Sequence, residues 1–190
     1  MLDKRSQILD AALTLCAEEG TAGAATARIA KAAGVANGTL FHHFPNKEAL
    51  ILCLYQEIKG RLAAALQPPE GALPLKAQAY HYWEGTMNWL LAHPRELRFL
   101  LGFFHSAALP LALRSRIINE TLTFLPILLA EGMRQGVVRP CPLPLLMEAC
   151  QGQFLACAAL FVAEPERSGD PEWHQAAFDL FWHAIARSAS

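Results

Sequence analysis

The chain has 190 residues, of which 53% are hydrophobic and 17% are charged, and its formal net charge is −1 at pH 7. This balance predicts a large buried core and excludes a disordered protein, which needs low hydrophobicity and high charge. It also excludes a bulk electrostatic attraction to nucleic acid, so any contact with DNA must depend on local cations and helix ends.

No membrane or secreted class is indicated by the sequence. No apolar run reaches the roughly 18–20 residues of a membrane span, and the N-terminal segment MLDKRSQILD lacks the apolar core of a secretory signal. We therefore expect a cytoplasmic protein without membrane association. The five cysteines are odd in number and form no CxxC pair, which argues against a disulfide framework or a zinc site. We expect no metal and no other cofactor.

Hydrophobic residues recur with helical spacing along nearly the whole chain, and strand-like alternation is scarce. The predicted fold is all-α, with an N-terminal three-helix domain joined by the fourth helix to a C-terminal bundle. Gly20 and Gly34 are expected to end the first two helices, and Thr26, Asn37 and Asn46 to cap the next three. The expected helices, about nine, lie near residues 3–19, 26–33, 37–44, 46–66, 72–92, 94–107, 111–135, 142–163 and 171–188.

The segment from Thr26 to Phe44 contains two short predicted helices with a glycine at their joint, which is typical of a helix-turn-helix. Ile29, Leu40 and Phe44 are expected to face the core. The other face of the second helix offers small and polar groups suited to base edges and phosphates in a major groove. The residues expected on this face are Ala36, Asn37, Gly38, Thr39, Phe41, His42 and His43.

The segment TARIAKAAGVANGTLFHHFPNKEAL, preceded by ILDAALTLCAEEG, resembles the DNA-binding motif of the tetracycline-repressor (TetR) family of bacterial transcriptional regulators over residues 5–55. The resemblance implies a homodimer in which residues 1–48 bind a double-stranded, palindromic operator. Residues 49–190 would bind a small, largely apolar effector and dimerise. The implied function is a repressor that the effector releases from DNA; the alternatives are an activator, or a helical ligand-binding dimer with weak or lost DNA binding.

The resemblance also implies roles for individual residues. Thr26 would lie beside a phosphate, Thr39 and His42 would reach bases or nearby phosphates, and His43 and Lys47 would hold the DNA backbone. Lys47 adds its charge to a helix start, which is itself an anion site. The full set of expected DNA-binding residues is Thr26, Arg28, Ala36, Asn37, Gly38, Thr39, Phe41, His42, His43 and Lys47.

Three positions depart from the family's usual pattern. Members commonly have tyrosine where this chain has Phe41 and serine where it has Ala36, so two phosphate-directed hydroxyls are missing. Arg28 takes a place that is often acidic or neutral and can restore one cation. Because phosphate contacts dominate affinity, we expect modest DNA binding with a shallow salt dependence.

The segment 72–105 contains more aromatic rings than one core stripe needs. A cavity lined by aromatic residues and methionine, with few polar groups, is how small apolar ligands are held. The alternative is that each of these residues belongs to the ordinary core. Pro126 is expected to kink the helix at 111–135. The candidate lining residues are Trp83, Met87, Phe103, His105, Phe124 and Phe154.

The last two predicted helices are apolar on more than one side, which predicts a dimer surface. The alternative is a monomer whose terminal helix closes its own core. A dimer agrees with two half-sites that need two recognition helices. The candidate interface residues are Cys150, Phe154, Cys157, Trp173, Phe178, Phe181, Trp182 and Ile185.

The sequence does not favour an enzyme. It contains no P-loop, GxSxG or HExxH motif. His81 and Glu84 lie one helical turn apart, but a di-iron bundle needs a repeated Glu-x-x-His pattern and two further glutamates, which are missing.

Overall fold

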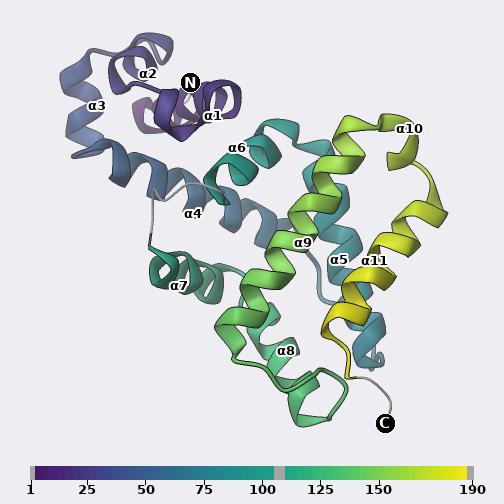
Figure 1. The fold of residues 1–190 in the computed structure, drawn as a ribbon. Helices are drawn as coiled ribbons and strands as arrows, with labels where there is room; N and C mark the ends of the chain where they lie inside the picture. Colours follow the sequence, from purple (N-terminus) through teal and green to yellow (C-terminus); the bar gives the residue numbers. More distant parts are fainter. Residues whose placement is uncertain (1–2, 105–109, 188–190) are drawn as a thin grey trace.

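The computed structural model describes residues 3–104 and 110–187, and in these ranges the chain forms eleven helices and no strand (Figure 1). The predicted all-α fold, an N-terminal helix-turn-helix domain followed by a helical bundle, is confirmed, whereas the expected number of about nine helices is too low. The helices are α1 (Lys4–Gly23), α2 (Thr26–Ala32), α3 (Asn37–His43), α4 (Lys47–Ala65), α5 (Leu75–Ala92), α6 (Pro94–Phe104), α7 (Leu111–Thr121), α8 (Phe124–Arg134), α9 (Leu143–Ala163), α10 (Pro165–Ser168) and α11 (Pro171–Ile185).

Two of the three expected helix caps are wrong. Thr26 and Asn37 are the first residues of α2 and α3, the alanine before each occupies the N-cap, and neither helix has a side-chain cap. Asn46 does cap α4, because its Oδ1 accepts a hydrogen bond from a first-turn N–H at 2.7 Å. Gly20 breaks the helical geometry of α1 with φ 75°, and one further helical turn follows it before α2.

Prolines mark helix starts rather than a kink. The helix expected at 111–135 is two helices, α7 and α8, separated at residues 122–123. Pro126 is the third residue of α8, where a missing N–H removes no intrahelical bond, so the expected kink at this proline is wrong. Pro94, Pro165 and Pro171 are the first residues of α6, α10 and α11, the position that best tolerates proline.

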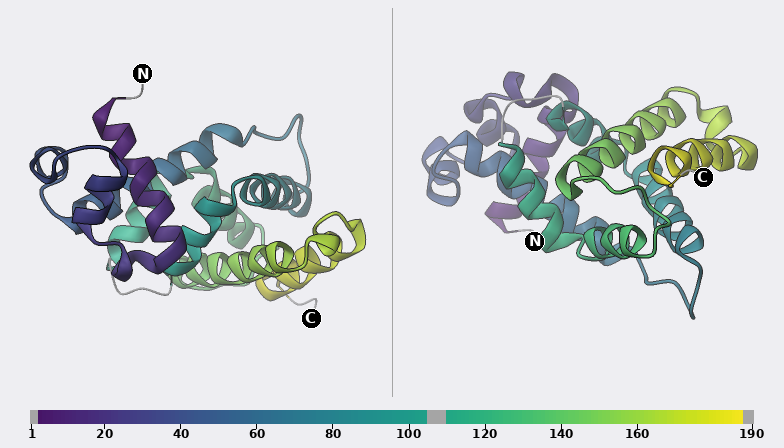
Figure 2. Two further views of the ribbon diagram at one scale, coloured as in Figure 1. Left: turned by 90° about the horizontal axis from the view of Figure 1, so that it is seen from above. Right: turned by 60° about the horizontal axis from the view of Figure 1, so that its bottom comes forward.

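The first three helices form one end of the molecule, and α4 runs from them into the bundle (Figure 1). The start of the bundle also returns to this end, because α6 packs against α1. At the other end α9 and α11 pack against each other and against α5 (Figure 2). The two helices that link the ends of the molecule are therefore α4 and α6.

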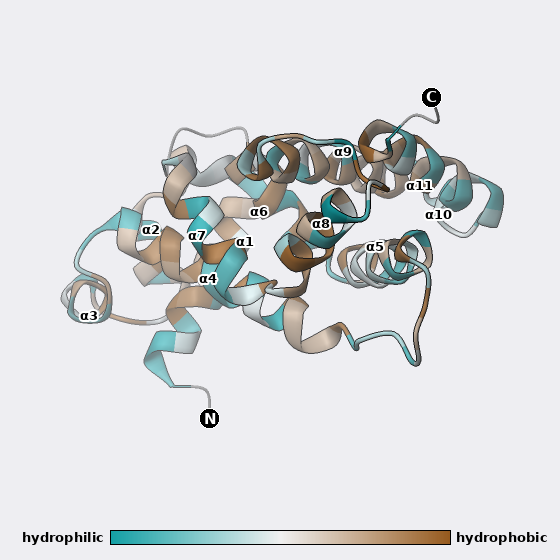
Figure 3. Cartoon of the chain, turned by 90° about the horizontal axis from the view of Figure 1, so that it is seen from below, coloured by the Kyte–Doolittle hydropathy of each residue, from teal (hydrophilic) through white to brown (hydrophobic). Residues whose placement is uncertain are grey.

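Helix α9 is apolar along most of its length (Figure 3). By length and composition it is the one helix in the described part of the chain that could cross a membrane, which corrects the expectation that no such stretch exists. The central helix of a bundle passes the same test. Helix α9 packs against α5, α6, α8, α10 and α11 on one side, whereas only 33% of its apolar window is buried, so another side of α9 faces solvent.

Candidate nucleic-acid interface and ligand cavity

The turn between α2 and α3 is fixed by the backbone. Gly34 has φ 66°, a conformation that favours glycine. Its N–H donates to the carbonyl oxygen of Lys31 at 3.2 Å, and the N–H of Val35 donates to that of Ala30 at 3.0 Å. These two bonds form a Schellman motif, which ends α2 and redirects the chain into α3.

One face of α3 is anchored in the core of the N-terminal domain. Leu40 is fully buried, Phe44 just after the helix is 3% exposed, and both join Ile29 of α2 in the core, as predicted. The anchors leave the opposite face in solvent. On it Ala36, Asn37, Gly38, Phe41, His42 and His43 are exposed, and Thr39 is half-buried.

The exposed face of α3 lets another surface come close to its backbone and offers groups that form hydrogen bonds. Gly38 has no heavy atom within 4 Å of the place where a Cβ would stand, so another surface can come near the backbone. The rings of His42 and His43 lie edge to face with centroids 5.5 Å apart. Phe41 is 43% exposed and offers an apolar ring without a hydroxyl. Such groups are suited to base edges in a major groove.

Two of the cations near this face already form hydrogen bonds with groups of the protein itself. Lys47 Nζ donates to the carbonyl oxygen of Ala22 at 3.0 Å and so ties the start of α4 to the end of α1. Arg28 donates two hydrogen bonds to the carboxylate of Glu19, at 2.5 and 2.6 Å, and this pairing lowers the pKa of Glu19. The additional cation expected at Arg28 is therefore already paired. Thr26 is half-buried at the start of α2.

Glu19→Gln is expected to free Arg28 and to make DNA affinity more sensitive to salt. One more cation that neutralises a phosphate steepens the slope of log K against log salt by about 0.9. A fluorescence titration at several salt concentrations measures this slope. Glu18→Gln is the matched control, because Glu18 carries the same charge on the same exposed end of α1 and Arg28 pairs with Glu19 instead. Equal slopes for the two variants would contradict a phosphate contact by the freed Arg28.

A cavity of about 120 Å³ lies inside the C-terminal bundle. Side chains of α4, α5, α6, α7, α8, α9 and α11 line it. Of the candidate residues, Trp83, Phe124 and Phe154 line the cavity, Met87 and Phe103 are buried in the core outside this lining, and His105 lies outside the described residues.

Sequence reasoning missed Lys59, which lies in the cavity lining on α4. A signal was present, because Ile51, Tyr55, Lys59 and Leu62 follow one another at helical spacing and all are buried. A lysine on an otherwise apolar stripe is unusual, since lysine is almost never fully buried without a partner. Phe103 is not in the lining because its ring stacks on Tyr55 with centroids 4.5 Å apart.

A second pocket of about 480 Å³ lies beside the first, between the start of α5 and α8. Tyr82, Phe124 and Leu128 line both pockets. The rings of Tyr82 and Phe124 are stacked with centroids 3.9 Å apart. This aromatic pair and Leu128 therefore lie between the interior cavity and the outer pocket.

Most of the candidate interface residues are covered by their own bundle. Cys150, Phe178, Phe181, Trp182 and Ile185 are buried, Phe154 and Cys157 are half-buried, and Trp173 is exposed. The large apolar side chains that α9 and α11 leave in solvent are Leu145, Leu160, Trp173 and Leu180, and of these only Trp173 is an expected interface residue. Helix α11 thus has an exposed apolar side besides its buried one.

Two short crossed helices with an exposed polar face, linked by a long helix to a separate bundle, define a helix-turn-helix DNA-binding protein. Residues 8–54 match the family model of bacterial regulatory proteins of the tetR family. The whole fold is similar to the crystal structure of a TetR-family transcription regulator from Shewanella sp. PV-4, with a TM-score of 0.91 and 35% identity over 98% of this chain and 100% of that one.

The chain is also similar to two curated relatives. The nucleoid occlusion factor SlmA of Haemophilus ducreyi is 26% identical over 90% of this chain and 89% of that protein. The HTH-type transcriptional repressor Rv1474c of Mycobacterium tuberculosis is 43% identical over 97 residues, which cover 51% of this chain and 46% of that protein. The chain belongs to the TetR family of transcriptional regulators.

Proposed function

We propose that the protein is a repressor that binds a palindromic operator as a homodimer through α3 and leaves it when a small molecule occupies the cavity. The observation that carries this proposal is the exposed face of α3, which Leu40 and Phe44 hold outward from a buried core. A helix of seven residues with one buried side chain contributes little to packing, which agrees with a role in recognition. The repressor name of the Mycobacterium tuberculosis relative supports the direction of regulation.

On the DNA, Thr39 and His42 of α3 are proposed to reach base edges. Gly38 lets the helix start approach closely, and His43 and Lys47 contact the backbone. Since phosphate contacts supply most of the affinity, the paired Arg28 and the missing hydroxyls support modest binding. The DNA-binding domain is proposed to comprise residues 1–48 and the bundle residues 49–190, in a cytoplasmic protein.

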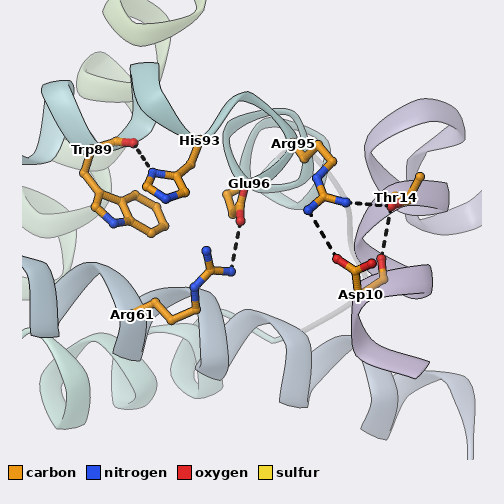
Figure 4. A network of polar contacts seen from close by, with 7 residues as sticks. All are labelled: Asp10, Thr14, Arg61, Trp89, His93, Arg95 and Glu96. Carbon is orange, nitrogen blue, oxygen red and sulfur yellow. Dashed lines mark hydrogen bonds and ion pairs between the residues drawn. The ribbon is translucent and has the colours of Figure 1, made fainter. Parts of the chain in front are cut away.

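Helix α6 offers a route for the signal from the cavity to the DNA-binding domain (Figure 4). Arg95 of α6 pairs with Asp10 of α1 at 3.2 Å and donates a hydrogen bond to Thr14 at 3.0 Å. On the other side of α6, Glu96 pairs with Arg61 of α4 at 2.9 Å. Because side chains of both α4 and α6 line the cavity, a ligand there can shift these helices, and α1 with them.

The partner protomer is proposed to cover the outward faces of α9 and α11. On α9 the exposed residues Leu145, Ala149, Ala156 and Leu160 recur at helical spacing and include no charge. An uncharged stripe of leucine and alanine lets two helices pack closely, and burial of its apolar area stabilises the contact. Leu180 of α11, which is 68% exposed, adds to the same apolar character.

Selection of bound sequences from a pool of random duplexes tests the proposal without knowledge of the genome. The expected result is a palindrome whose half-sites are spaced by about one helical turn or a multiple of it. An enriched single half-site would contradict the dimer, and absence of enrichment would favour a ligand-binding dimer that has lost DNA binding. The position of the selected site relative to a promoter then distinguishes a repressor from an activator.

A further inference from the structure

The side chain of Lys59 is buried in the wall of the cavity. It is 6% exposed and lines a space whose other walls are formed mainly by leucine, phenylalanine, tryptophan and methionine side chains. Taking an ammonium out of water is costly unless an acceptor or an opposite charge replaces the water. The position of Lys59 therefore requires a partner.

Among residues 3–104 and 110–187, no hydrogen bond and no ion pair to Lys59 is found. Its Nζ is not one of the completely inaccessible polar atoms, so the ammonium keeps some accessible surface. Its Nζ lies 5.5 Å from the centroid of the Tyr55 ring, within the range of a cation–π attraction, but this contact supplies neither a hydrogen-bond acceptor nor a negative charge. The carboxylate whose charge acts on Lys59 is that of Glu148, which itself pairs with Arg114 at 3.5 Å. Burial accordingly lowers the pKa of Lys59 to about 8, although Glu148 opposes this effect.

The cavity lining contains more donors than acceptors. The indole N–H of Trp83 is buried and has no acceptor among the described residues. The hydroxyl of Thr86 donates to the carbonyl oxygen of Tyr82 at 2.7 Å. No aspartate or glutamate lines the cavity in the described part of the chain. The amide of Gln151 and the hydroxyl of Tyr82 also line the cavity, so the lining offers neutral acceptors but no opposite charge. A bound molecule that brings a negative charge therefore best matches the ammonium.

We propose that the effector is a small monocarboxylate with an apolar body, and that its carboxylate binds Lys59. This inference rests on the proposed function and names the ligand class of the same cavity. The apolar body lies among the leucine and aromatic side chains, and the carboxylate accepts hydrogen bonds from the ammonium and from the indole N–H of Trp83.

The volume of the cavity limits the size of the ligand. A cavity of about 150 Å³ accommodates benzene, so a cavity of about 120 Å³ matches a somewhat smaller apolar body of about five carbon atoms. Hexanoate has such a body beside its carboxylate, and benzoate, with a ring of six carbon atoms, is slightly larger. A longer chain must displace the Tyr82–Phe124 stack to extend into the outer pocket.

The position of Lys59 on α4 connects the ligand's charge to the DNA-binding domain. Two residues further along α4, Arg61 pairs with the buried carboxylate of Glu96 on α6 (Figure 4). Drawing the Lys59 ammonium toward a carboxylate moves the segment of α4 that holds α6. Helix α6 in turn holds α1 through Arg95.

The experiment compares hexanoate with hexanamide, which has nearly the same shape and no charge. Binding to the full-length protein is measured by isothermal titration calorimetry at pH 7. We expect hexanoate to bind at least about tenfold more tightly than hexanamide, because a hydrogen bond to a charged group contributes more than one between neutral groups. Lys59→Met, and Lys59→Gln as a second variant, should remove this preference, whereas the exposed Lys76→Met should preserve it.

The pH dependence provides a second readout. The ionisable groups around Lys59 are Tyr55, Tyr82, Cys150 and Glu148. Burial raises the pKa of Tyr55 and of Cys150 to about 12 and also raises that of Tyr82, and Glu148 pairs with Arg114. Across pH 7 to 9.5 the change of charge is therefore that of Lys59. Hexanoate affinity should fall as the pH rises above about 8, and hexanamide affinity should stay constant.

Three outcomes would overturn the inference. The first is equal affinity for the acid and the amide, and the second is a preference for the acid that persists in both Lys59 variants. The third is no binding of hexanoate, octanoate and benzoate at millimolar concentration. Release from an operator duplex is measured separately. Binding of the acid without release supports the carboxylate site and contradicts control by the cavity. Release by neutral apolar molecules alone supports the proposed function and contradicts the carboxylate site.

Discussion

Lys59→Met is expected to stabilise the unliganded protein by about 3 kcal/mol at pH 7. Burial lowers the pKa of Lys59 from 10.5 to about 8, and each pH unit of such a depression corresponds to about 1.4 kcal/mol. A methionine side chain of similar length fills the same space without a charge. The free energy of unfolding, from urea denaturation monitored by circular dichroism, measures the difference.

The sign of the pH dependence distinguishes this effect from better packing. Above pH 10.5 the lysine is neutral in both the folded and the unfolded chain, and below about pH 8 it is charged in both. Between these values the unfolded chain binds more protons, so the wild type gains stability as the pH rises. The advantage of Lys59→Met should therefore be full at pH 7 and shrink toward pH 10.5.

Lys76→Met is the control for the loss of one positive charge. Lys76 is exposed and pairs with Asp179 at 3.0 Å, so its replacement should change the stability by less than about 1 kcal/mol. A Lys59→Met protein that is less stable than the wild type at pH 7 would show that the ammonium is favourably solvated, and would contradict the unpartnered buried charge.

The double variant Thr39→Ala, His42→Ala is expected to weaken operator binding by at least about a hundredfold. Each base contact contributes about 1–3 kcal/mol, and both residues lie on the face of α3 opposite the buried Leu40. Because His42 is exposed and Thr39 is half-buried, the fold should be preserved. Fluorescence anisotropy with the selected operator and with a random duplex measures the two affinities.

The matched control carries the same changes away from both the DNA-binding face and the proposed dimer surface, as Thr121→Ala, His81→Ala on α7 and α5. It should bind the operator like the wild type. The recognition variant should retain its affinity for the random duplex, since contacts to phosphates carry no sequence information. A loss of equal size on both duplexes would mean that α3 contributes only backbone contacts.

The N-terminal domain could be predicted from the sequence because its signals are local. The turn depends on one glycine, the core of the domain depends on Ile29, Leu40 and Phe44, and the start of α4 depends on the cap at Asn46. Each of these signals acts on residues that are close to it in the chain. The caps at Thr26 and Asn37 were predicted one residue too late, since side-chain type alone does not place a helix start to a single residue.

The C-terminal bundle could be predicted only in part, because its site depends on helix packing. Of the aromatic candidates, Trp83, Phe124 and Phe154 line the cavity. Aromatic content alone could not distinguish these lining residues from Phe103, because the Phe103 ring stacks on Tyr55 where α6 meets α4. Lys59 was visible as a charge on an apolar stripe, but its lack of a partner follows from the tertiary structure.

The two apolar sides of α11 show the same limit. Helical spacing identified both sides, but only packing against α5 and α9 decides which one is buried. Phe178 and Trp182 proved to be core residues, and Leu180 lies on the solvent side. Periodicity therefore predicts that a helix has two apolar sides, but it does not predict which side packs in the core and which side is left for a partner.

The most direct test of sequence-specific DNA binding is a titration of the full-length protein with the DNA upstream of its own gene, beside a random duplex, at two salt concentrations. We predict a saturable site preferred over the random duplex by at least about a thousandfold, with a shallow dependence on salt. Equal binding of both duplexes would contradict sequence recognition by α3, and a steep salt slope would contradict the small number of phosphate contacts inferred from the paired Arg28.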